Sequence, residues 1–262
     1  MALGLNPRRT CAFMLSELTS TAQAAVRRPC QLPDDTIEVW RVSLAAVVSG
    51  RLPHSDEAVA VRFQQVDAAA RWRAGRWVLR RILAGHSGIA PEDVPLLRGR
   101  WGKPFLSAGP SFNVTSAGND VVIVVRATGE IGVDLQVVEV SSLDLQAVAG
   151  QLLNSADSTA PRARWARLEA LLKCRGLGFS AAVPAKLIAA LATTHGQVHR
   201  GGHTMWWADQ PHASGALCIA ADAPWEQLVE RSLNDSYPAP FSARQSPSAS
   251  SCPPRDRAYP DR

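Results

Sequence analysis

The segment from residue 121 to residue 136 constrains the fold more than any other part of the sequence. Five consecutive β-branched residues, Val121 to Val125, predict a buried strand. A turn over 127–130 follows, and a return strand over 131–136 is expected to complete a hairpin. Asp134 lies in this second strand, where an acid among apolar neighbours needs a partner or a cation.

Residues 165–178 have the pattern of an amphipathic helix. Apolar residues recur at spacings of three and four, and a glycine follows them as a C-terminal stop. Glu169 and Lys173 lie one turn apart at the border of this apolar stripe. Two interpretations are open: an ordinary surface ion pair, or a carboxylate and an ammonium that face a site holding a metal and a phosphate.

Other periodic segments predict secondary structure in both halves of the chain. Alternation over 36–42 predicts a strand, and the runs 204–208 and 215–220 predict the two strands of a closing hairpin. Residues 56–85 favour a helix throughout, with a possible break near Asp67.

Composition limits the class of protein. With 262 residues and 46% hydrophobic content, the chain can bury one large core or two small ones. No apolar run approaches the roughly 20 residues of a membrane-spanning helix, so a soluble protein is expected. The five cysteines lack C-x-x-C spacing, which argues against a disulfide framework or a zinc site and fits a reducing cytoplasm.

One segment carries more positive charge than the whole chain. The chain has a formal net charge of +5, whereas residues 62–103 hold nine basic residues against three acids, a net +6. Such a segment suits nucleic acid, an acidic protein or a phosphate-rich small molecule. Arginines 73, 76 and 80 form a stripe that could contact a ligand or pair with acids elsewhere. Arg98 and Lys103 project from a loop stiffened by two glycines and a proline, where a phosphate contact is reasonable.

Four motifs occur in order along the chain: Gly102-Lys103-Pro104-x-Leu106, Phe112-Asn113-Val114-Thr115, Gly132-Val133-Asp134-Leu135 and Trp165-x-x-x-Glu169-Ala170-x-x-Lys173-x-x-Gly176-x-Gly178. In this order and at these separations they resemble the 4′-phosphopantetheinyl transferase superfamily. The resemblance is to the longer, single-chain, surfactin-synthetase-activating type, and it covers roughly residues 37–222.

The resemblance implies a group-transfer reaction. Members of this family move the phosphopantetheine arm of coenzyme A to a serine of an apo acyl or peptidyl carrier protein, releasing adenosine 3′,5′-bisphosphate. A Mg²⁺ ion bridges the diphosphate and offsets its charge. The implied partners are coenzyme A and an acidic carrier protein of fatty-acid, polyketide or nonribosomal peptide synthesis. A cytoplasmic monomer that binds neither nucleic acid nor membrane is expected.

The resemblance also implies roles for particular residues. Asp134 and Glu169 would ligate Mg²⁺, with Gln136 in a third ligand position. Glu169 would take the proton of the attacking serine, and Lys173 would hold a diphosphate oxygen. The nucleotide end of coenzyme A, chiefly its 3′-phosphate, would be held by residues of the N-terminal half: Arg62, Arg98, Lys103, Thr115 and Ser116.

The architecture implied by the resemblance is α+β, a pseudo-twofold pair of similar halves in one chain. Residues 35–127 would form the N-terminal half, on the side of the coenzyme A phosphates and nucleotide. Residues 128–235 would form the C-terminal half, with the metal and the catalytic residues. A flexible extension is expected over 1–34 and a disordered tail over 236–262.

Departures from the family pattern keep other functions open. Gln136 replaces a common acid, Ser116 a histidine and Leu168 a lysine. These residues suggest a catalytically weakened paralogue that binds coenzyme A or a carrier protein without efficient transfer. A nucleic-acid-binding protein is a third hypothesis, based on the basic segment and its interleaved Trp72 and Trp77.

Overall fold

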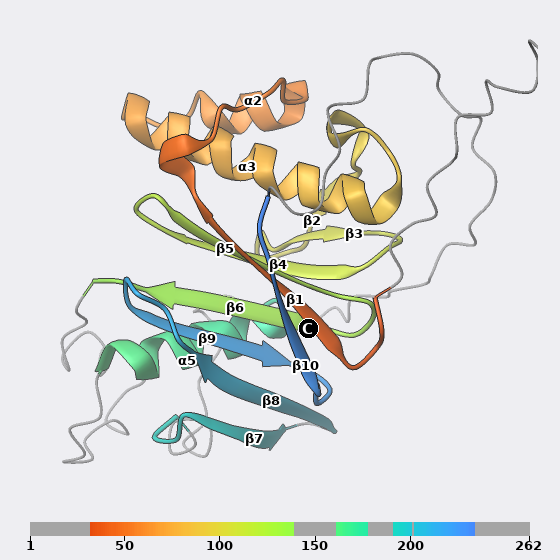
Figure 1. Ribbon diagram of the computed structural model, residues 1–262, viewed down its shortest axis with the longest axis vertical. Coiled ribbons are helices and arrows are strands. Elements are labelled where there is room, and N and C mark those ends of the chain that lie inside the picture. The colour runs from red at the N-terminus through yellow and green to blue at the C-terminus, as the bar shows by residue number, and fades with distance from the viewer. Residues whose placement is uncertain (1–31, 139–160, 178–190, 201, 234–262) are drawn as a thin grey trace, which may run out of the picture.

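The computed structural model describes residues 32–138, 161–177, 191–200 and 202–233 (Figure 1). Almost all of the expected N-terminal extension and the whole expected tail at 236–262 lie outside these residues. The elements, in chain order, are β1 (Thr36–Ser43), η1 (Leu44–Ala46), α2 (His54–Ala60), α3 (Val66–Ser87), η2 (Pro91–Asp93), β2 (Leu96–Arg98), β3 (Pro104–Leu106), β4 (Ser111–Ala117), β5 (Asp120–Arg126), β6 (Ile131–Gln136), α5 (Pro161–Cys174), β7 (His195–Arg200), β8 (His203–Gln210), β9 (Ala216–Ala221) and β10 (Gln227–Arg231).

Two units with the same chain order make up the fold, which is α+β as predicted. In the first unit β1 is followed by α3 and then by β4 and β5, and β5 lies between β1 and β4 in the sheet. In the second unit β6 is followed by α5 and then by β8 and β9, and β9 lies between β6 and β8. Strand β7 extends the second sheet, and β10 joins the first sheet parallel to β1.

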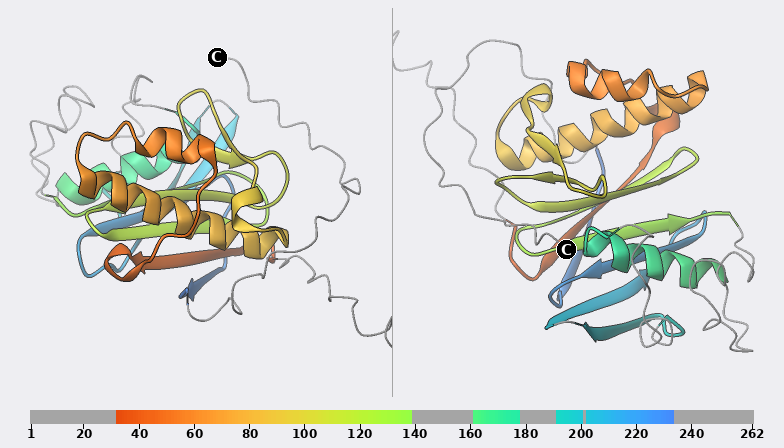
Figure 2. Two further views of the ribbon diagram at one scale, coloured as in Figure 1. Left: turned by 90° about the horizontal axis from the view of Figure 1, so that it is seen from above. Right: turned by 180° about the vertical axis from the view of Figure 1, so that it is seen from behind.

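The two sheets pack face to face, and each carries its helix on the outer face (Figures 1 and 2). Successive side chains of each strand point to opposite faces of its sheet, as expected for an extended chain. In β1, for example, Ile37 and Val39 face the second sheet, whereas Trp40 and Val42 pack towards α3. Because β5 lies between these two cores, its five-residue apolar run is buried on both faces. The buried strand predicted over 121–125 is therefore confirmed.

The turn at 127–130 does not close the expected hairpin. Strand β5 pairs with β1 and β4, whereas β6 pairs with β9. The reason is that each strand turns an apolar face to the other sheet, so Val122 and Val124 pack against Ile131 and Val133 across the space between the sheets. The turn therefore carries the chain from one sheet into the other.

The other predicted elements are present with small differences. The strand predicted over 36–42 is β1, and the closing hairpin is β8 and β9. The helix predicted over 56–85 is divided into α2 and α3, so the expected break is real. Within the described part of the chain, no helix has the length and apolar content needed to cross a membrane.

The arginine stripe of α3 pairs with acids of α2. Arg80 Nε lies 2.5 Å from a carboxylate oxygen of buried Asp56, and Arg76 lies 3.5 Å from the other oxygen. Arg73 donates to Glu57 at 2.9 Å. Part of the positive charge of the basic segment is thus neutralised by acids of the same protein. Of the two hypotheses for the stripe, contact with a ligand or pairing with acids, the structure supports pairing with acids.

Helix α5 approaches β6 so closely that position 132 accepts only glycine. A Cβ atom on Gly132 would lie 2.0 Å from the carbonyl oxygen of Ala170 and 2.4 Å from the backbone nitrogen of Cys174. Both atoms belong to the backbone of α5, so rotation of a side chain would not relieve the clash. Since Asp134 follows two residues later on the same face of β6, this contact brings the last turns of α5 beside that acid.

We expect Gly132→Ala to destabilise the protein by about 1–3 kcal/mol or more, because the helix would have to move off the sheet. Urea unfolding of the two chains measures this difference. Gly75→Ala is the matched control: its Cβ would meet only side-chain atoms, the nearest at 3.7 Å, and its place within α3 favours alanine. Equal stability of the Gly132→Ala variant and the parent chain would contradict the close contact.

Candidate functional site

Three of the predicted site residues meet at the contact of α5 with β6. The Lys173 ammonium lies 2.5 Å from Asp134 Oδ1 and 3.3 Å from Glu169 Oε2. The two carboxylate oxygens can therefore be no more than about 5.8 Å apart, which is the sum of these distances. The pair on α5 is thus more than a surface ion pair, because its lysine also contacts a buried acid of the neighbouring strand.

Asp134 is a buried carboxylate that is only partly satisfied. It is 3% exposed, and its Oδ1 accepts hydrogen bonds from Lys173 and from the Thr115 hydroxyl. Its other oxygen, Oδ2, is buried without a hydrogen-bond partner among the described residues. The pKa of Asp134 is raised to about 6 because burial removes water from the carboxylate; Lys173 opposes the shift, and Glu169 adds to it as a like charge.

Glu169 is held by Trp165, the first residue of the fourth motif, for which no role was predicted. The Trp165 indole N–H donates to Glu169 Oε1 at 2.7 Å, one helical turn away. Oε2 is left to contact Lys173. The spacing of four between tryptophan and glutamate was a signal for this bond, since side chains at that spacing lie on the same helix face.

Side chains of β4 connect the two units beside Asp134. Strands β4 and β6 are edge strands of different sheets. Asn113 Oδ1 accepts from the Val133 N–H at 2.9 Å, and Thr115 Oγ1 accepts from the Leu135 N–H at 3.2 Å. Asn113 belongs to the second motif, but no role was predicted for it; it bonds the backbone of the strand that carries Asp134.

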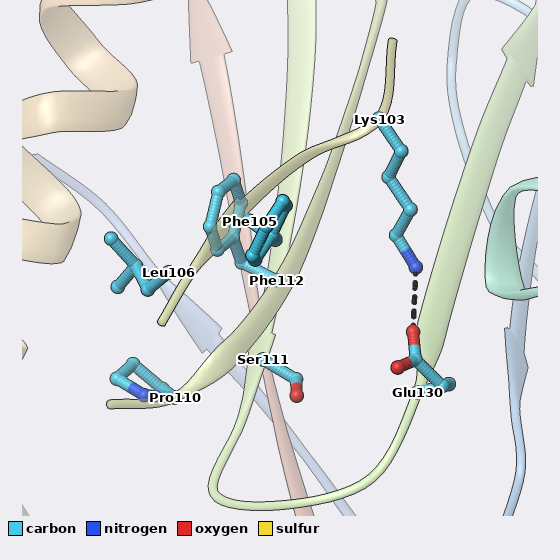
Figure 3. Close-up of a pocket in the computed structure, with 7 residues that line it drawn as sticks. All are labelled: Lys103, Phe105, Leu106, Pro110, Ser111, Phe112 and Glu130. Atoms are coloured by element: carbon cyan, nitrogen blue, oxygen red, sulfur yellow. Dashed lines mark hydrogen bonds and ion pairs between the residues drawn. The ribbon is translucent and has the colours of Figure 1, made fainter. Parts of the chain in front are cut away.

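Lys103 uses all three of its ammonium protons within the protein. Its Nζ donates to Glu130 Oε2 at 3.0 Å, to the Ile131 carbonyl at 3.0 Å and to the Cys174 carbonyl at 3.1 Å. Figure 3 shows the side chain extending from its loop to Glu130. Lys103 therefore ties the start of β6 to the end of α5, and its predicted contact with a phosphate stays a prediction.

A small hollow lies next to Lys103 (Figure 3). Its cavity volume is about 10 Å³, which is close to what one water molecule requires. It is far too small for a nucleotide. The hollow is lined by Lys103, Phe105, Leu106, Pro110, Ser111, Phe112 and Glu130.

The other predicted ligand-binding residues lie at the surface or near it. Arg62, in the turn between α2 and α3, and Arg98, on β2, are exposed. Ser116 is exposed on β4, next to buried Thr115. Gln136 ends β6, and its side-chain amide donates to the Val138 carbonyl at 3.2 Å.

The donor set at Asp134 and Glu169 fits a hard divalent cation. Among the described residues no group of three or more His, Cys, Asp or Glu side chains gathers for a metal. The two acids nevertheless share one ammonium, and the buried Oδ2 of Asp134 has no hydrogen-bond partner within the described part of the chain. Carboxylate oxygens with few other protein ligands are what Mg²⁺ uses beside a substrate phosphate.

Comparison with known proteins agrees with the motifs. No family model matches the chain. The chain is 34% identical over 134 residues to 4′-phosphopantetheinyl transferase HetI of Nostoc sp., covering 45% of this chain and 54% of that protein. It is 31% identical, with the same coverage, to slr0495 of Synechocystis sp., which is provisionally named a 4′-phosphopantetheinyl transferase.

The chain spans about half the length of the curated relatives it matches. Both relatives carry the name of the family that the four motifs indicated. The resemblance of this chain to the 4′-phosphopantetheinyl transferase superfamily is therefore confirmed.

Proposed function

We propose that the protein transfers the 4′-phosphopantetheine arm of coenzyme A to a serine of an apo acyl or peptidyl carrier protein, with Mg²⁺, and releases adenosine 3′,5′-bisphosphate. The observation that carries this proposal is the contact of Asp134, Glu169 and Lys173 at one point between α5 and β6. The names of the two relatives support the same reaction class.

Glu169 is the proposed base for the serine hydroxyl. Its carboxylate is half-buried and keeps one oxygen bonded to Trp165, so its orientation is fixed on α5. An ionised carboxylate held in this way can accept the serine proton directly or through one water molecule. The serine oxygen then attacks the β-phosphorus of coenzyme A, and the bond from that phosphorus to the oxygen bridging the diphosphate breaks.

Lys173 is the proposed contact for the leaving group. Its side chain is 31% exposed, so it can reach a ligand while remaining next to both acids. A positive charge beside the leaving phosphate stabilises the negative charge that develops there. The ammonium would exchange its carboxylate partners for a diphosphate oxygen as the substrate binds.

Asp134 and Glu169 would hold the Mg²⁺ ion, with the amide oxygen of Gln136 as a neutral third ligand. When bound, the ion supplies charge neutralisation for the diphosphate. Asp134 Oδ2, which has no hydrogen-bond partner among the residues that the structure describes, is the atom that most needs such a cation. The proposed contacts for the nucleotide end remain Arg62, Arg98, Lys103 and Ser116. The proposed partner is an acidic carrier protein, and the protein is proposed to be a cytoplasmic monomer.

We expect Asp134→Asn and Glu169→Gln to lower the transfer rate by roughly 10²–10⁴-fold, because each removes a charge from the site without changing its shape. The assay incubates the protein with Mg²⁺, coenzyme A and an apo carrier protein, and mass spectrometry measures the gain of the arm. Glu230→Gln is the matched control, since Glu230 pairs with Arg41 at the surface of the first sheet.

Transfer at the parent rate by either site variant would contradict the assigned roles. Binding of coenzyme A or the carrier protein by the parent chain without transfer would instead favour the weakened paralogue. Gln136 supports that second candidate, because an amide contributes no charge to the metal site and its nitrogen is engaged with Val138.

The raised pKa of Asp134 predicts a pH dependence of stability in the absence of metal. The folded-state pKa of about 6 exceeds the ordinary value of 3.8. The stability that Asp134 contributes is therefore fully present below about pH 4 and is lost as the pH rises through about 6. Asp134→Asn lacks this dependence, so we expect it to gain up to about 3 kcal/mol relative to the parent chain between pH 4 and pH 8.

Urea unfolding with EDTA at several pH values measures this difference. Mg²⁺ added at pH 8 should restore stability to the parent chain, because the ion binds the ionised carboxylate, and should have less effect on Asp134→Asn. A constant difference in unfolding free energy between the two chains across this pH range would contradict the assignment.

A further inference from the structure

The Thr115 hydroxyl, on β4, makes hydrogen bonds to two residues of β6. It accepts from the Leu135 N–H at 3.2 Å and donates its single proton to Asp134 Oδ1 at 3.2 Å. The residue is 6% exposed. Because a hydroxyl has only one proton, a bond from Thr115 to a phosphate oxygen would require it to release Asp134.

The position of Thr115 is itself fixed by the fold. It lies on β4, the edge strand of the first sheet, whereas Asp134 and Leu135 lie on β6, the edge strand of the second. Asn113 makes a parallel contact to β6 two residues earlier, from the same face of β4. Two bonds at this spacing hold the strands in one register, so the hydroxyl cannot shift without separating the two units.

The contact leaves the two oxygens of Asp134 unequal. Oδ1 receives Thr115 and Lys173, whereas Oδ2 has no hydrogen-bond partner in the described part of the chain. Lys173 is the partly exposed member of this set, on a long and flexible side chain. Thr115 is therefore the fixed donor that holds the plane of the carboxylate when the lysine turns to a ligand.

We propose that Thr115 is a positioning residue, which orients the Asp134 carboxylate for the divalent cation and does not bind a phosphate of coenzyme A. This inference rests on the proposed function and changes the role that the resemblance implied for Thr115. Donors of this kind set the orientation and the affinity of a carboxylate ligand, and their loss commonly costs about 10–100-fold in metal affinity.

The test compares Thr115→Val, which keeps the shape and removes the hydroxyl, with Thr115→Ser, which keeps the hydroxyl. Isothermal titration of Mg²⁺ or Mn²⁺ into the protein without substrate measures metal affinity directly. We expect Thr115→Val to weaken binding by about 10-fold or more and Thr115→Ser to stay within about 3-fold of the parent chain. In the transfer assay, the Mg²⁺ concentration for half-maximal rate should rise likewise, while KM for coenzyme A measured at saturating Mg²⁺ stays within about 2-fold.

A structural control separates positioning from general loosening between the strands. Asn113→Ala removes the neighbouring bond to β6 without touching Asp134. We expect it to lower the melting temperature but to leave metal affinity within about 3-fold of the parent chain. If Thr115→Val does not fold, Thr115→Ala replaces it, because the smaller side chain leaves room for relaxation.

Two outcomes would overturn the inference. One is a raised KM for coenzyme A with unchanged metal affinity in Thr115→Val, which would make Thr115 a phosphate contact. The other is an equal loss of metal affinity in Asn113→Ala. If the parent chain binds the metal but transfers no phosphopantetheine arm, the proposed function is wrong. The metal titrations would still test the role of Thr115 in that case.

Discussion

The close contact of α5 with β6 is the constraint on which the site depends. No side chain fits at position 132, so the helix backbone lies directly against the strand. Two residues along the strand, this proximity brings the Lys173 ammonium onto a carboxylate oxygen of Asp134. A larger residue at 132 would push the helix outwards and separate the charges, because the obstructing atoms are backbone and cannot rotate away. The packing of α5 against β6 therefore also brings Lys173 and Asp134 together.

Side chains join the two units at the edges of their sheets, where the backbone pairing between strands ends. Strand β4 ends one sheet and β6 ends the other, and Asn113 and Thr115 satisfy N–H groups of β6. Edge strands left open invite pairing with other chains, so these bonds also protect the edges. The same two residues belong to the second of the four sequence motifs. Their place between the units explains why this motif and the one containing Asp134 meet in space although they are separate in sequence.

Local sequence patterns predicted the helices and strands well. They predicted much less well which strands pair with each other. The run from Val121 to Val125 indicated a buried strand because its composition alone excludes exposure. The turn after it was expected to close a hairpin, since the chain reverses over four residues. The partner of β6 is instead β9, and the paired residues are separated by 80 (Gln136 and Ala216) to 90 (Ile131 and Ala221) positions. Glu169 and Lys173 were found from their spacing on one helix. The bonds of Lys103, by contrast, join three distant segments and left no local signal.

Charge balance shows why the site favours a dication together with a diphosphate. Two carboxylates and one ammonium leave a net charge of −1 when both acids are ionised, and the raised pKa of Asp134 reflects the cost of burying that charge. A dication changes the balance to +1, and a diphosphate then meets a positive site. A dication alone leaves excess positive charge in this poorly hydrated site, and a diphosphate alone leaves excess negative charge. In the proposed function, metal and coenzyme A would therefore bind cooperatively, with Lys173 passing from the acids to the phosphate as the site fills.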